Sequence, residues 1–244
     1  MSEPVSIVRQ EFAYSAPKQG TSRGQCEDQW AVAVDGSAAA VCDGASDAAY
    51  SRLWASVLVQ RFVEEPTVDI DSQWLQVAVS RFERSLDYLS MPWHLLERTL
   101  RGSYATLAGA VFRNESGVFD VVGIGDSSIA WVNMTDKGMF PLQAPEEFSD
   151  RTYLVSTVCE CNRSMADFVC IKRCIPLPKG DTYVFLMTDA VGHWYAREIA
   201  EGRQPWRAFL SLKSQAAFED WLADERANGL RNDDATIVDL RATA

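Results

Sequence analysis

The order of strand and helix patterns along the chain constrains its fold more than any other feature. The chain begins with alternating, β-branched segments and then changes to a helical period, in which Trp54, Leu58 and Phe62 share one face. Strand patterns return after residue 103 and fill the middle of the chain, before two helical segments and a closing strand. A doubly wound parallel sheet requires strict alternation of strands and helices, which this order lacks. The sequence therefore predicts antiparallel sheets covered by helices, an α+β architecture.

The same patterns predict where the individual elements lie. Strands are expected at residues 5–14, 30–35, 38–42, 104–113, 118–124, 128–134, 152–158, 167–174, 182–188 and 235–241. Helices are expected at residues 48–64, 72–88, 93–102, 191–201 and 215–227. No repeat, low-complexity tract or long linker interrupts these segments, so we expect a single domain over residues 1–244.

Composition and charge exclude several classes of function. The chain has 244 residues, of which 47% are hydrophobic, so it can bury a sizeable core. Its formal net charge of −11 argues against binding to a nucleic-acid backbone. No apolar run reaches the roughly 18 residues of a membrane helix, and the N-terminus lacks the pattern of a signal peptide. We therefore expect a cytoplasmic protein with reduced cysteines and with neither a nucleic-acid nor a membrane partner.

Aspartates recur at the ends of the predicted strands rather than on helix faces. They are Asp28, Asp43, Asp126, Asp189, Asp233 and Asp234. Each one alone is commonly a turn former or a helix cap. If the strands lie in two facing sheets, however, their ends converge at one edge and the carboxylates form a cluster.

Such a cluster has a characteristic chemistry. Carboxylate oxygens repel one another and bind hard divalent cations such as Mg²⁺ or Mn²⁺. Two such ions a few Å apart share a water molecule, lower its pKa and turn it into a nucleophile. The same ions screen a phosphoryl group from an acidic protein. Gly44, next to Asp43, allows a tight turn that exposes its carbonyl as a further hard ligand.

The ordered set of motifs resembles the metal-dependent Ser/Thr protein phosphatases of type 2C over nearly the whole chain. The matching segments are Arg23 four residues before Glu27-Asp28, Asp43-Gly44, Ala105-Thr106, Gly125-Asp126-Ser127, Thr188-Asp189 and Asp233-Asp234-Ala235-Thr236. Cys26-Glu27-Asp28, Asp43-Gly44-Ala45-Ser46 and residues 148–152 look most like a compact bacterial branch of the family.

The resemblance implies a fold and a reaction. The fold would be a four-layer α-β-β-α sandwich of two packed antiparallel sheets flanked by helices. The reaction would be hydrolysis of phosphoserine or phosphothreonine in a protein, by direct attack of a metal-bound hydroxide, with two Mn²⁺ or Mg²⁺ ions. The substrate would be a protein phosphorylated by a bacterial Ser/Thr kinase.

The resemblance also implies roles for individual residues. Asp43 would bridge two metal ions, and the Gly44 carbonyl would bind one of them. Asp189 and Asp233 would hold the other ion, and Asp28 would act through metal-bound water. Arg23 would orient the substrate phosphate, since a guanidinium binds two phosphate oxygens at once.

Two departures from the family pattern concern the same region. The family usually has a His after Asp-Gly as a general acid, and this chain has Ala45. A carboxylate four residues after the late Asp is replaced by His193. A third, weaker metal position would therefore use Asp126 and His193.

Three alternatives remain open at this stage. The departures favour an inactive phosphatase-fold protein that binds phosphoproteins, whereas retention of Asp28, Asp43, Asp189 and Asp233 favours an enzyme. The enzyme's substrate is either a phosphoprotein or a small phosphomonoester. The four later cysteines are either zinc ligands or free thiols, and their spacing differs from that of a zinc ribbon.

Overall fold

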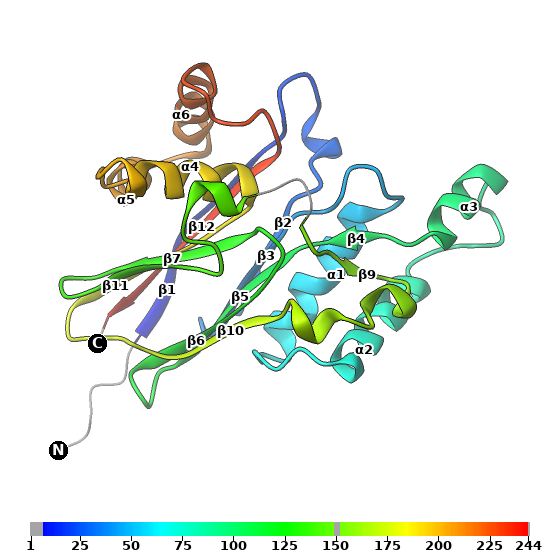
Figure 1. The fold of residues 1–244 in the computed structure, drawn as a ribbon, viewed down its shortest axis with the longest axis horizontal. Helices are drawn as coiled ribbons and strands as arrows, with labels where there is room; N and C mark the ends of the chain where they lie inside the picture. Colours follow the sequence, from blue (N-terminus) through cyan, green and yellow to red (C-terminus); the bar gives the residue numbers. More distant parts are fainter. Residues whose placement is uncertain (1–6, 149–151, 244) are drawn as a thin grey trace.

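The computed structural model describes residues 7–148 and 152–243, and two five-stranded antiparallel sheets form its centre (Figure 1). Sheet A contains, in spatial order, β1 (Ile7–Ala16), β12 (Ala235–Thr243), β11 (Asp181–Met187), β7 (Ser128–Val132) and β8 (Lys137–Phe140). Sheet B contains β10 (Cys170–Pro176), β6 (Val118–Ile124), β5 (Leu107–Arg113), β3 (Ala38–Cys42) and β2 (Gln29–Val32). A small ribbon pairs β4 (Tyr104–Ala105) with β9 (Val155–Ser156).

Helices cover the outer face of each sheet. On sheet B lie α1 (Ser51–Glu64) and α2 (Ser72–Arg84), while α3 (Trp93–Leu100) projects beyond them (Figure 1). On sheet A lie α4 (Asp189–Ala200), α5 (Trp206–Ser211) and α6 (Gln215–Ala227). Short 3-10 turns are η1 (Arg23–Gln25), η2 (Pro145–Glu147), η3 (Cys159–Asn162) and η4 (Met165–Asp167). This arrangement confirms the expected α+β sandwich of four layers.

Strand β3 explains why the two sheets and α1 pack so closely. Its alternate residues Ala39 and Val41 belong to the core between the sheets, whereas Ala38 and Ala40 face the helices. Both faces are therefore buried, and the strand reads as one apolar run. On the neighbouring strand β5, the ring of Phe62 from α1 lies directly on Gly109, where a Cβ atom would overlap it.

Several local features differ from the expected ones. The strand expected at 152–158 shrinks to β9, and Cys159 and Cys161 lie in η3 instead. Strand β8 and helix α5 were not predicted, and both are short. The helix expected to run to residue 88 ends at Arg84. Residues 149–151 of the segment resembling the bacterial branch, and residues 1–6, lie outside the described residues.

The topology gathers particular strand ends at one end of the sandwich. Strands β3, β6 and β11 end there. Strands β2, β7 and β12 begin there, because β2 runs antiparallel to β3, and both β7 and β12 run antiparallel to β11.

Within the described residues, no helix is both long enough and apolar enough to span a bilayer.

The contact between Phe62 and Gly109 gives a test of the packing. We expect Gly109→Ala to lower the free energy of unfolding by about 1–3 kcal/mol, because the added methyl group overpacks the ring of Phe62. Gly24→Ala is the matched control, since its nearest other atom is 3.9 Å from the added carbon. Equal urea midpoints for the two variants would contradict this account of the core.

Candidate active site

Five aspartates come together at the end of the sandwich where these strands finish and begin. Asp43 follows β3, Asp126 lies between β6 and β7, and Asp189 is the first residue of α4. Asp28 and Asp233 lie just before β2 and β12. The pKa of Asp43 is raised well above its usual value, first by burial and then by the charges of the other four carboxylates. The aspartates thus form one electrostatically connected cluster.

Asp28 is the most deeply placed member of the cluster. Its side chain is buried, and its Oδ2 accepts a hydrogen bond of 2.8 Å from Thr188 Oγ1. Thr188 Oγ1 also accepts from the backbone N–H of Thr236 at 3.0 Å, which ties the carboxylate to β12. The Oδ1 atom of Asp28 is buried without a hydrogen-bond partner among the described residues. Burial raises the pKa of Asp28 well above its usual value, and the nearby carboxylates add to this effect.

Asp126 and Asp189 are partly exposed and interact with each other. Burial raises the pKa of Asp189 to about 7, and the charges of Asp126 and Asp233 contribute. Asp189 Oδ1 accepts from the N–H of Ala190 at 2.6 Å. Asp126 Oδ2 accepts a 2.9 Å hydrogen bond from Thr152, and burial raises its pKa as well.

The backbone around Gly44 is clamped against the start of β4. The N–H of Ala45 donates to the carbonyl of Tyr104, and the N–H of Thr106 donates to the carbonyl of Asp43, each at 2.9 Å. These two bonds lie on either side of Gly44, and neither of them uses the carbonyl of Gly44. A Cβ atom at Gly44 would stand 2.8 Å from the backbone of the first residue of α1, so only glycine allows the helix to begin this close to the turn.

Asp234 has a structural role that differs from that of its neighbour Asp233. Asp234 is buried, and its two oxygens accept from the N–H groups of Lys18 at 2.8 Å and Glu27 at 2.7 Å. It therefore holds the loop that leads to Asp28. Asp233 is partly exposed, and its Oδ1 accepts from the N–H of Asp234 at 2.9 Å.

Lys18 and Arg231 lie beside the cluster, and the sequence pattern singled out neither of them. Lys18 Nζ lies 3.9 Å from Asp233 Oδ1 and donates to Ser46 Oγ at 3.0 Å. Arg231 Nη1 lies 3.9 Å from Asp189 Oδ2, and its Nη2 donates to the carbonyl of Phe148 at 3.1 Å. Its position two residues before Asp233 was the one feature of the sequence that could have indicated that Arg231 lies near the cluster.

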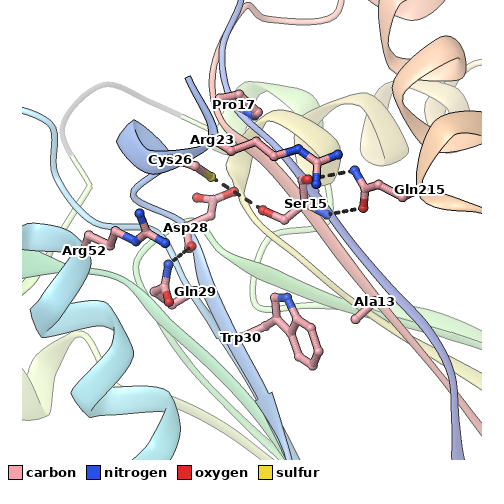
Figure 2. A pocket seen from close by; sticks show the side chains of 10 residues that line it. All are labelled: Ala13, Ser15, Pro17, Arg23, Cys26, Asp28, Gln29, Trp30, Arg52 and Gln215. Atoms are coloured by element: carbon pink, nitrogen blue, oxygen red, sulfur yellow. Dashed lines mark hydrogen bonds between the residues drawn. The ribbon is translucent and has the colours of Figure 1, made fainter. Parts of the chain in front are cut away.

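Arg23 lies in a cleft next to the cluster rather than within it. The cleft has a volume of about 420 Å³ between the edge strands β1 and β2, and Asp28, Arg52 and Gln215 also line it (Figure 2). The guanidinium of Arg23 is paired with Glu219 of α6. Arg52 of α1 donates to the carbonyl of Gly24 at 2.7 Å and so supports the turn that carries Arg23.

His193 is oriented by an aromatic neighbour. Its ring meets that of Phe148 edge to face, with centroids 5.6 Å apart. Burial lowers its pKa, and the nearby cations Arg231 and Arg197 lower it further, so the imidazole is neutral at neutral pH. Across residues 7–148 and 152–243, no three His, Cys, Asp or Glu side chains form a group that could hold a metal ion as they stand. The aspartates are thus near one another without converging on one point.

Comparisons with solved structures support the fold. The catalytic domain of the serine threonine protein phosphatase PstP, in complex with two manganese ions, is 14% identical with a TM-score of 0.58, and the match covers 98% of this chain and 100% of that one. PppA, a key regulatory component of T6SS in Pseudomonas aeruginosa, is 15% identical with a TM-score of 0.61, over 97% and 99% of the two chains. A bacterial serine phosphatase is 15% identical with a TM-score of 0.56, over 97% and 98%. No curated protein matches the chain.

The sequence itself gives a family match. A model of the family described as protein phosphatase 2C matches residues 19–239. This range includes Arg23 and all five clustered aspartates. The match covers most of the chain and agrees with the four-layer sandwich, so the chain belongs to the protein phosphatase 2C family.

Proposed function

We propose that this protein is a metal-dependent phosphatase that hydrolyses phosphoserine and phosphothreonine in proteins. The observation that carries the proposal is the cluster of five aspartates, in which burial and mutual repulsion raise the pKa values of Asp28, Asp43, Asp126 and Asp189. Such a cluster is unfavourable alone and becomes favourable when cations bind. PstP, a solved relative, is in complex with two manganese ions, which supports this choice of ligand.

The donor atoms are of the kind that divalent ions prefer, although the aspartates would have to draw together around the ions. Asp43 and the carbonyl of Gly44 would hold one ion, and Asp43, Asp189 and Asp233 would hold the other, all through hard oxygen atoms. The buried Oδ1 of Asp28, which lacks a partner among the described residues, provides an acceptor at the edge of the set. When bound, Mn²⁺ or Mg²⁺ lowers the pKa of water and screens the negative charge of a phosphoryl group.

Asp28 and Arg23 would act on the substrate side of the reaction. Thr188 holds one oxygen of Asp28, so the other oxygen, Oδ1, would orient the attacking water and accept its proton. Arg23 would bind two phosphate oxygens after it leaves Glu219. The carboxylate of Glu219 thus competes with the phosphate of the substrate for the same guanidinium.

A third divalent ion is less favourable than the first two. It would use Asp126 and His193, but Arg231 already places a positive charge 3.9 Å from Asp189, beside that position. A neutral imidazole also brings no charge to balance a divalent ion. We therefore propose a site with two ions and a weak third position.

Hydrolysis of an aryl phosphate tests the proposal directly. We expect turnover of p-nitrophenyl phosphate with Mn²⁺ or Mg²⁺ but not with EDTA, and a loss of about 10²-fold or more in Asp43→Asn. Asp220→Asn, an exposed change on α6, is the matched control and should retain full activity. Phosphopeptides compared with small phosphates then identify the substrate class.

If the protein shows no turnover in this assay, the lack of a general-acid His at Ala45 would not explain the result. An aryl phosphate has a good leaving group and needs little help from a general acid. Silence of the folded protein with every metal would therefore reject the enzyme and favour the phosphoprotein-binding module. Binding of a phosphopeptide without hydrolysis would then be the property to measure.

The pairing of Arg23 with Glu219 predicts opposite effects of two substitutions. Arg23→Ala should raise KM for a phosphopeptide about tenfold, because the phosphate loses a bidentate charged hydrogen bond. Glu219→Gln should lower KM with little change in kcat, because Arg23 is released for the substrate. Steady-state kinetics of both variants provide the check, and a higher KM in Glu219→Gln would show that Glu219 positions Arg23 instead.

Metal-free protein should lose stability as pH rises. The pKa values of Asp28, Asp43, Asp126 and Asp189 are raised in the folded state, so their contribution is present at low pH and is lost as pH rises through the folded pKa, about 7 for Asp189. In EDTA we expect a lower Tm at pH 8 than at pH 6. Asp43→Asn should shrink this difference, and Mn²⁺ should remove most of it in the wild type. A Tm that rises with pH in EDTA would contradict the predicted direction.

A further inference from the structure

A second cavity lies on the outer face of sheet A, close to the end of α5. Its volume is about 290 Å³, which far exceeds the roughly 30 Å³ of one water molecule. Its lining includes Glu11, Tyr14, Tyr183, Lys213, Asp239 and Arg241. None of these residues belongs to the aspartate cluster or to the cleft beside it.

Asp239 is a buried carboxylate that lines this cavity. Its side chain is 1% exposed, and it lies in β12 opposite Phe12 and Phe185, among side chains that face the helices. Oδ1 of Asp239 is buried and has no hydrogen-bond partner among the described residues. Asp239 forms no ion pair within 4 Å among the described residues. A buried charge in this state is costly unless something pairs with it.

A β-bulge brings a second carboxylate to the same cavity. The register of β1 against β12 shifts between Gln10 and Phe12, so Glu11 is an extra residue opposite the Asp239 region. Bulges change the direction of side chains, and here both Glu11 and Phe12 line the cavity. Two carboxylates that form no ion pair within the described residues therefore border one hollow.

Of the two cations that line the cavity, only Arg241 is paired with a carboxylate, and its Nε atom is buried without a hydrogen-bond partner among the described residues. Arg241 pairs with Asp181 and lies over the ring of Tyr183. Lys213 Nζ donates to the carbonyl of Leu210 at 2.8 Å. Glu11 and Asp239 thus face one cation, Lys213, that forms no ion pair within the described residues, so the cavity keeps an excess of negative charge. Its apolar surface comes from aromatic rings and from Leu210 and Leu212.

We propose that this cavity binds a small organic cation carrying a primary ammonium or guanidinium group, held by Asp239 and Glu11. Aromatic faces attract organic cations, and Phe12 and Tyr14 stack with ring centroids 4.6 Å apart along the lining. An inorganic cation would gain little from these rings. The size of the cavity suits a ligand of a few carbon atoms.

The titration of Asp239 gives the binding a characteristic pH dependence. Burial and the charge of Glu11 raise the pKa of Asp239 to about 7, whereas Lys213 and Arg241 act in the opposite direction. A cation binds the ionised form. Affinity should therefore rise about tenfold between pH 6 and pH 8, as the ionised fraction of a group with this pKa increases.

The experiment uses n-butylammonium as the probe, with n-butanol and butyrate as neutral and anionic counterparts of similar shape. Nuclear magnetic resonance titration of the ¹⁵N-labelled full chain should show saturable shifts around Asp239 and Lys213 for the ammonium alone. Asp239→Asn should abolish these shifts, and Glu11→Gln should weaken binding several-fold. Asp220→Asn on the surface of α6 is the matched control and should bind like the wild type.

Each alternative outcome overturns the proposal. Equal binding of butanol would indicate a merely apolar hollow, and binding of butyrate or inorganic phosphate would assign the cavity to anions through Lys213. No saturable shift with the ammonium at pH 8 would indicate a cavity that holds water. If Asp239→Asn fails to fold, Glu11→Gln decides, because Glu11 is exposed and its loss should still weaken binding.

Discussion

The packing of sheet A against sheet B is the interaction on which the site depends. Residues such as Val41 and Ala108 from one sheet meet Val184 and Val238 from the other, and this apolar layer fixes the strand ends relative to one another. The five aspartates are attached to those ends. Their repulsion and loss of hydration oppose folding, and the burial of the apolar layer offsets this opposition. The site is therefore a region of unfavourable electrostatics held in place by favourable packing elsewhere.

The chain reduces this repulsion with its own cations. Lys18 lies beside Asp233, and Arg231 lies beside Asp189. Neither contact is as short as a direct hydrogen bond, so both leave carboxylate oxygens available. Arg231 stands next to Asp189, beside the position of a third ion, in a chain that has His193 in place of the expected carboxylate. The two features are consistent with each other, since each lowers the negative charge beside the third position.

Much of the fold and the clustering of the aspartates could be predicted because they depend on local patterns. The apolar run over residues 38–42 indicated a strand, and the position of each aspartate at a strand end followed from such patterns. The partners of Arg23 and Asp234 could not be predicted. Glu219 lies 196 residues from Arg23, and the N–H groups that Asp234 binds lie more than 200 residues away, so no local pattern links them. The strand expected at residues 152–158 shrinks to β9, because β4, its partner in the described structure, is only two residues long.

Strand β12 and the residue before it carry two acids that the structure treats differently, and the difference follows from their positions. Asp234, just before the strand, satisfies its oxygens with backbone N–H groups of a neighbouring loop. Asp239 lies on the face of β12 that packs against the helices, and Ile237, two residues earlier, lies on the same face. An acid at a position where the alternation calls for an apolar side chain is unfavourable unless it serves a purpose beyond packing. A charged residue that interrupts an otherwise apolar strand face is therefore a signal of a candidate binding cavity beside that face. This holds for β12 even though the candidate active site lies just before the same strand.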